Sequence, residues 1–213
     1  LIAILFRTSQ EDSLPPPSEF AGDLVGTLVL AMLLPLVALV MGTASIGNEI
    51  EDGTVVFLLA KPIDRWRVVV VKAVVAGLAS AAVCVPTTVA TTWIIVGDND
   101  GGLVVGLGLA ALVASVVYSV LFVALSTVTS RALVIGLIYV FVWEGILANV
   151  FTGLAWLSVR AYSEAVADAT ISVATYRADL GAPAGIVMAL LAITGALVAG
   201  SRKLAGFEIG ERA

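Results

Sequence analysis

Long apolar stretches separated by short polar segments form the main pattern along this chain. Four of these stretches carry no charged residue and a fifth is interrupted only by Glu144; they cover residues 24–48, 73–97, 101–130, 180–201 and 132–159. A helix needs about 20 predominantly apolar residues to cross the hydrocarbon core of a membrane. The stretches are too long for barrel strands and lack their alternation of apolar and polar positions. They therefore predict membrane-spanning helices over residues 24–46, 68–97, 102–129, 132–150 and 182–201.

The first six residues, Leu1 to Phe6, are also apolar. We interpret residues 1–6 as the last part of a further span whose beginning is missing from this sequence. A cleaved signal peptide is the alternative, but neither a basic region nor a small-residue cleavage site is visible. The fold expected is an all-α integral membrane bundle of six helices, the first one truncated, in a single transmembrane domain over residues 1–213.

Composition excludes several classes of protein. Apolar residues make up 60% of the chain and charged residues 13%, whereas soluble domains average about 45–50% and about 25%. The net charge of −5 argues against a nucleic-acid partner. The chain has no histidine and one cysteine, Cys84, which excludes a histidine base, a Cys/His zinc site and an internal disulfide.

The basic residues indicate an orientation. If the loop after residue 46 is cytoplasmic, eight Lys and Arg residues fall inside the cell and three fall outside. The eight inside are Lys61, Arg65, Arg67, Lys72, Arg131, Arg202, Lys203 and Arg212. Cytoplasmic loops of membrane proteins carry such an excess. We therefore expect a multi-pass protein of the cell membrane with both termini in the cytoplasm and an external segment over residues 151–181.

The cytoplasmic loop over residues 46–67 is the richest segment in polar residues. An acidic stretch, Glu49 to Asp52, ends at Gly53-Thr54 and is followed by an apolar hexapeptide too short to span a membrane. Asp64 is placed to cap the next helix. Such a segment suits a position in the membrane interface or docking into a groove of a soluble partner. A merely amphipathic reversal between two spans is the third alternative.

This loop carries a resemblance to a known family. The pattern Glu49-x-Glu51-x-Gly53-Thr54, followed by Leu58-Leu59, Pro62, Arg65 and Lys72, resembles ABC-2-type transporter permeases, most closely those of nitrous-oxide-reductase maturation and bacterial drug export. The resemblance implies that residues 46–67 form a coupling elbow that contacts an ATPase subunit. The implied contact residues are Glu49, Glu51, Asp52, Gly53, Thr54, Phe57, Leu58 and Arg65. The alternative for the acids is a solvated cluster, and for Arg65 and Lys72 it is pairing with those acids or with lipid phosphates.

The chain has no Gly-x-x-x-x-Gly-Lys-Ser/Thr sequence, so we do not expect it to be an enzyme. We expect no cofactor in this chain, and we expect ATP and Mg to be bound by the partner ATPase subunit. The function expected is that of the membrane-spanning permease of an ABC exporter, which works as a homodimer or heterodimer with ATPase subunits in a lipid bilayer. The alternatives are a secondary transporter or channel without an ATPase, and a membrane anchor that recruits a soluble partner.

Glu144 is the only ionisable residue expected deep inside a span. It lies about 18 Å along the fifth predicted span, at about 1.5 Å per residue. A buried ionisable residue in a membrane indicates a functional site by default. A substrate or proton role is one possibility for Glu144. The other is a hydrogen bond to the N-terminal end of a short helix that re-enters the outer leaflet after Gly145.

Overall fold

The computed structural model of the chain describes residues 2–4, 15–52, 64–147, 152–169, 171 and 180–206. Within these residues the secondary structure is helical and contains no strand, which confirms the all-α prediction. Four helical stretches are long and apolar enough to cross a membrane: Pro17–Gly47, Arg65–Val96, Gly101–Val128 and Ala182–Leu204. Ala132–Leu147 is a shorter apolar helix. The count of six spans stays a prediction.

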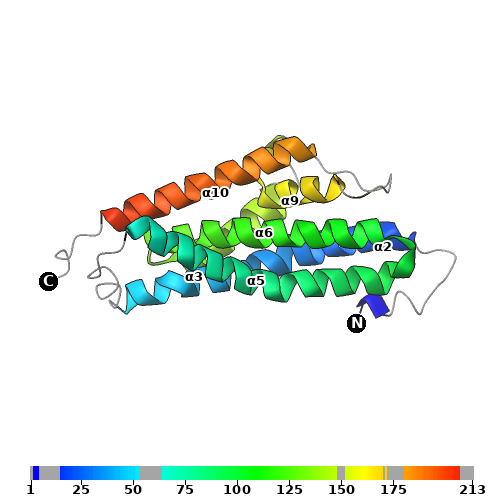
Figure 1. Cartoon of the computed structure of the whole chain (residues 1–213), viewed down its shortest axis with the longest axis horizontal. Helices are drawn as coiled ribbons and strands as arrows, with labels where there is room; N and C mark the ends of the chain where they lie inside the picture. The colour runs from blue at the N-terminus through cyan, green and yellow to red at the C-terminus, as the bar shows by residue number, and fades with distance from the viewer. Residues whose placement is uncertain are drawn as a thin grey trace.

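The elements follow one another as long rods that lie side by side (Figure 1). The first rod consists of α2 (Pro17–Leu24), η1 (Val25–Leu33) and α3 (Leu34–Glu51), and the next two are α5 (Arg65–Val96) and α6 (Gly101–Val128). The remaining elements are η2 (Gly97–Asn99), α7 (Ala132–Ile138), η3 (Tyr139–Leu147), η4 (Thr152–Leu157), α9 (Val159–Asp168) and α10 (Ala182–Ala205).

Helix α6 forms the centre of the bundle. It is buried over 72% of its apolar stretch, against 17% for α10. The neighbouring helices approach it closely at glycines: a Cβ atom on Gly42 of α3 would lie 2.8 Å from Cβ of Phe122, and one on Gly200 of α10 would lie 3.3 Å from Cα of Ala124. Small residues permit this contact between helices where no hydrophobic effect drives their association.

Two segments within the described part of the chain are π-helical. The wider turns of η1 end at Leu33, two residues before Pro35. Proline lacks an N–H group, and in an α-helix its ring would clash with the carbonyl four residues earlier. The N–H of Leu34 donates instead to the carbonyl of Val29, five residues back. The second π-helix, η3, follows α7 and is in contact with η1. Single-turn π-bulges inside helices occur often at functional sites.

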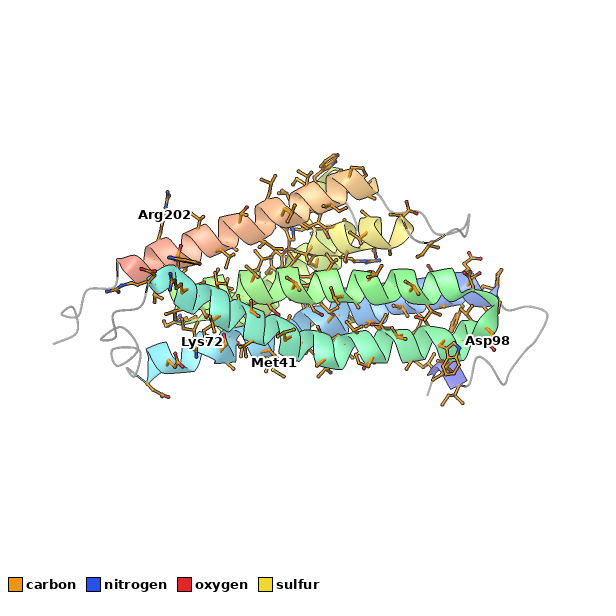
Figure 2. All side chains as sticks on the ribbon, in the orientation of Figure 1. Met41, Lys72, Asp98 and Arg202 are labelled. Carbon is orange, nitrogen blue, oxygen red and sulfur yellow. The ribbon has the colours of Figure 1, made fainter. Side chains whose placement is uncertain are left out.

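The two ends of the bundle differ. At the hairpin end, α5 passes through η2 into α6, and Gly97 adopts a φ of 67° that favours glycine. At the other end, which we call the elbow end, α3 ends, α5 begins and α10 ends (Figure 1). Figure 2 shows Lys72 and Arg202 toward the elbow end and Asp98 at the hairpin end.

Helix α9 packs against both α6 and α10. Its residues Tyr162 and Ala165 are buried. Gly185 of α10 leaves the room for this contact, because a Cβ atom there would lie 2.6 Å from Cβ of Ala165. Residues 172–179 of the expected external segment lie outside the described residues.

Candidate functional sites: the elbow end and the Glu144 cluster

An ion pair joins α3 to α5 at the elbow end. Nζ of Lys72 lies 2.5 Å from Oε1 of Glu49, and the two side chains are only 26% and 34% exposed. The two residues are 23 positions apart in the sequence, on either side of the segment that connects the two helices. Of the two alternatives offered by the sequence for Lys72, the structure shows pairing with an acid of the elbow.

A second contact joins α5 to α10. Arg65, the first residue of α5, donates a hydrogen bond of 2.9 Å from its guanidinium to the carbonyl oxygen of Leu204, in the last turn of α10. The last four carbonyls of a helix have no partner within the helix. A positive charge near them is also favoured by the helix dipole. Arg65 thus satisfies a carbonyl of α10 while it belongs to α5.

Asp64 does not cap α5 with its side chain as predicted. It precedes Arg65 as expected, but its carboxylate makes no cap hydrogen bond and lies 3.1 Å from Nε of Arg67 instead. The charged guanidinium three residues further along supplies a stronger donor than a backbone N–H. Both side chains are exposed, so this pair contributes little stability.

The predicted elbow residues are therefore placed as follows. Glu49 and Arg65 lie at the same end of the bundle, each in contact with a neighbouring helix. Glu51 is the last residue of α3, and Asp52 is exposed in the turn after it. Gly53, Thr54, Phe57 and Leu58 lie outside the described residues. Contact of the elbow with an ATPase subunit stays a prediction.

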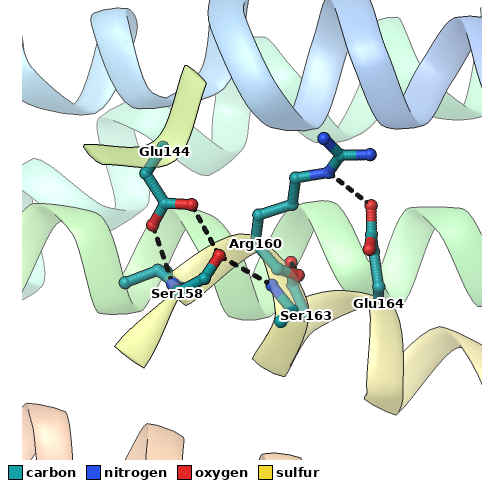
Figure 3. Close-up of polar contacts among 7 residues, drawn as sticks. Glu144, Ser158, Arg160, Ser163 and Glu164 are labelled. Atoms are coloured by element: carbon teal, nitrogen blue, oxygen red, sulfur yellow. Dashed lines mark hydrogen bonds and ion pairs between the residues drawn. The ribbon is translucent and has the colours of Figure 1, made fainter. Parts of the chain in front are cut away.

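The second site surrounds Glu144 in η3. Glu144 is 1% exposed, and its carboxylate accepts at least three hydrogen bonds, two of which are drawn in Figure 3. The hydroxyl of Tyr139 donates to Oε1 at 3.1 Å, the hydroxyl of Ser158 to Oε2 at 2.6 Å, and the backbone N–H of Val159 to Oε1 at 2.8 Å. We call these four residues the Glu144 cluster.

The geometry shows what the carboxylate does. Val159 is the first residue of α9 and Ser158 is its N-cap, whose hydroxyl also accepts a 3.3 Å hydrogen bond from the N–H of Ala161. The first N–H groups of a helix have no partner within the helix, and the dipole there favours an anion. Glu144 therefore caps α9 from a different element. This is the structural alternative that the sequence offered beside a substrate or proton role, although the capped helix begins at Val159 and not nearer Gly145.

An ion pair on α9 lies next to the cluster (Figure 3). Nε of Arg160 is 2.6 Å from Oε1 of Glu164, and both side chains are largely buried, at 23% and 17% exposure. A Cβ atom on Gly26 of η1 would lie 3.6 Å from that Glu164 oxygen and 3.7 Å from a guanidinium nitrogen of Arg160. These are ordinary van der Waals distances, so the ion pair lies directly against η1 at Gly26.

Tyr139, Ser158 and the Arg160–Glu164 pair were not among the site residues predicted from the sequence. The four-residue spacing of Arg160 and Glu164 is a signal for an ion pair along a helix. A serine before a helical stretch is likewise a signal for an N-cap. Nothing in the spacing indicates that Ser158 meets Glu144, because that contact depends on the chain turning back between residues 147 and 158.

Together these features define a helical, multi-pass membrane protein. A family model described as ABC-2 family transporter protein matches residues 4–161 of the 213, which is more than half of the chain. The chain therefore belongs to the ABC-2 transporter family and is a permease component of an ABC transporter. The matched residues include Glu49, Arg65, Glu144 and Ser158. No curated protein and no solved structure matches the chain. The narrower resemblance to nitrous-oxide-reductase maturation permeases stays a prediction.

Proposed function

We propose that this permease is the membrane-spanning subunit of an ABC exporter, works as a dimer, and is driven by separate ATPase subunits that bind at the elbow. The observation that carries the proposal, beside family membership, is the attachment of three helices at the elbow end. Glu49 and Lys72 join α3 to α5, and Arg65 joins α5 to α10. A displacement of residues 53–63, which connect α3 to α5, would therefore act on three helices together.

The distribution of charge supports a cytoplasmic elbow end. Of the basic residues that the structure describes, all except Arg160 lie near this end: Arg65, Arg67, Lys72, Arg131, Arg202 and Lys203. Asp98 and Asp100 flank the turn at the hairpin end. By the positive-inside rule, this arrangement supports the proposal that the elbow end, and with it the end of α10, is cytoplasmic.

The chemistry of the cycle is assigned to the partner. The sequence offers no phosphate-binding loop of the Walker type. ATP and Mg would be held by the ATPase subunit, while this chain would move rather than catalyse.

Copurification tests the proposal. The chain is expressed in membranes together with a candidate ABC ATPase subunit, and the complex is isolated in detergent. Asp52, exposed after α3, is the acid best placed to meet a partner, so Asp52→Lys is expected to reduce recovery of the ATPase subunit. Asp98→Lys, at the hairpin end, is the matched control and should leave recovery unchanged.

A second variant separates binding from transmission. Arg65→Met removes the hydrogen bond to Leu204. The ATPase subunit should still bind, but stimulation of its ATP hydrolysis by the permease should fall. A chain that copurifies with no ATPase subunit, or that conducts ions alone in a planar bilayer, would contradict the proposed function.

A further inference from the structure

Exposed arginines stand at the elbow end of three helices. Arg67 lies in the first turn of α5, Arg131 directly precedes α7, and Arg202 lies in the last turn of α10. All three are exposed. Among the described residues, Arg131 and Arg202 form no ion pair, and Arg67 forms one, with the exposed Asp64. We call Arg67, Arg131 and Arg202 the arginine rim.

Each arginine of the rim stands at the end of an exposed apolar stripe on its own helix. Residues four, seven or eleven positions apart lie on nearly the same face of a helix. Exposed apolar residues occupy these positions relative to the arginines, namely Val71, Val74 and Leu78 on α5, Ile135 and Ile138 on α7, and Val198 and Leu191 on α10. Helices α5 and α10 are also the least buried of the four long helical stretches. Each guanidinium therefore lies at the border of an outward-facing apolar surface.

The length of the stripe on α5 indicates what covers it. Arg67 stands near one end of this helix, and the exposed Trp93 stands near the other end, 26 residues further along. At about 1.5 Å per residue, the two positions lie about 39 Å apart along the helix. A bilayer is about 40–45 Å thick when its headgroup regions are included. Both ends of the stripe can therefore lie among headgroups while the apolar residues between them face acyl chains.

The two ends of this stripe differ in chemistry. At the hairpin end, Nε1 of Trp93 donates a 3.3 Å hydrogen bond to the carboxylate of Asp98, which would repel a phosphate. At the elbow end, the guanidinium of Arg67 lies 5.5 Å from the ring centroid of the exposed Trp66. A guanidinium donates paired hydrogen bonds to phosphate, and a long basic side chain reaches headgroups while its stem stays beside apolar surface. The elbow end is therefore the end suited to a phosphate group.

We propose that the arginine rim binds the phosphate groups of anionic phospholipids at the membrane surface of the elbow end. The occupant is a lipid because each guanidinium adjoins an apolar stripe suited to an acyl chain. Positive charge on three helices favours an anionic headgroup over a zwitterionic one. Asp64 weakens this binding, since its carboxylate lies 3.1 Å from Nε of Arg67 and competes for the guanidinium. The inference does not require an ATPase partner and goes beyond the proposed function.

The test measures lipid binding by the full chain, purified in a neutral detergent. Native mass spectrometry follows binding of phosphatidylglycerol and of phosphatidylcholine, and the ratio of their dissociation constants gives the preference for anionic lipid. The parent chain is expected to prefer phosphatidylglycerol. Each of Arg67→Gln, Arg131→Gln and Arg202→Gln should lower the preference by up to about fivefold, the contribution of one basic residue near an anionic surface. The triple glutamine variant should lose most of the preference.

Three further variants separate charge from position and from folding. The triple variant with lysine at the same positions retains the charges and should retain most of the preference. Asp64→Asn removes the competing carboxylate and should raise the preference. Glu19→Gln, which removes an exposed acid of α2 near the hairpin end, is the matched control and should leave the preference unchanged (Figure 1).

Two results would assign the rim to another occupant. Displacement of bound phosphatidylglycerol by excess glycerol 3-phosphate would show that the rim recognises soluble phosphate. A triple glutamine variant that keeps its lipid preference but no longer recovers the ATPase subunit would show that the rim meets a protein. A triple glutamine variant with the lipid preference of the parent chain, or an Asp64→Asn variant whose preference does not rise, overturns the proposal.

Discussion

The Glu49–Lys72 ion pair is expected to couple α3 to α5 energetically as well as geometrically. Exposed ion pairs contribute about 0.2–1 kcal/mol in double-mutant cycles. This pair has a donor–acceptor distance of 2.5 Å with about two thirds or more of each side chain shielded. Charge-assisted hydrogen bonds contribute about 1.5–3 kcal/mol, and partial desolvation lowers that figure. We therefore expect a coupling energy of about 1–2 kcal/mol.

The assay is a double-mutant cycle with Glu49→Gln, Lys72→Met and the double variant. The free energy of unfolding is measured by titration with sodium dodecyl sulfate in mixed micelles. The free energy of unfolding lost in each single variant should exceed half of that lost in the double variant. The reason is that each single variant leaves one partly buried charge without its partner. The Asp64–Arg67 pair, which is more exposed, serves as the control and should give a coupling energy below about 0.5 kcal/mol. Equal coupling energies for the two pairs would refute the reasoning.

Two further predictions concern helix contacts. Gly42→Ala is expected to destabilise the chain by about 1–2 kcal/mol in the same titration, since the added methyl group meets α6 at overlapping distance. Gly195→Ala, where nothing lies within 4 Å, should instead stabilise it by up to about 1 kcal/mol; the opposite order would contradict the packing. Arg65→Leu should increase the rate of hydrogen exchange in the last turn of α10 by about tenfold or more, the factor that corresponds to the loss of one charge-assisted hydrogen bond. Arg67→Leu should not, and an unchanged rate in both variants would argue against the Arg65 contact.

The sequence predicts the helical architecture well, because an apolar stretch of sufficient length in a membrane has few structural alternatives. It does not distinguish η3 from an α-helix, since the apolar run around Phe141 and Val142 is compatible with either. It also does not predict that Ser158 returns to Glu144, because that contact is tertiary. Asp64 shows the same limit at short range, since a nearby arginine competes with the backbone for its carboxylate.

The two polar sites share a physical principle that bears on mechanism. Arg65 satisfies a carbonyl at the C-terminal end of α10, and Glu144 satisfies an N–H at the start of α9. Each charge serves the unsatisfied backbone of a neighbouring helix, where the helix dipole has the opposite sign. Charges engaged in this way are poorly suited to carry ions or protons through the bundle, because releasing either one would expose a helix end. They are well suited to hold neighbouring helices in a fixed arrangement, and the proposed drive by an external ATPase would require that movement of one helix is passed to the next.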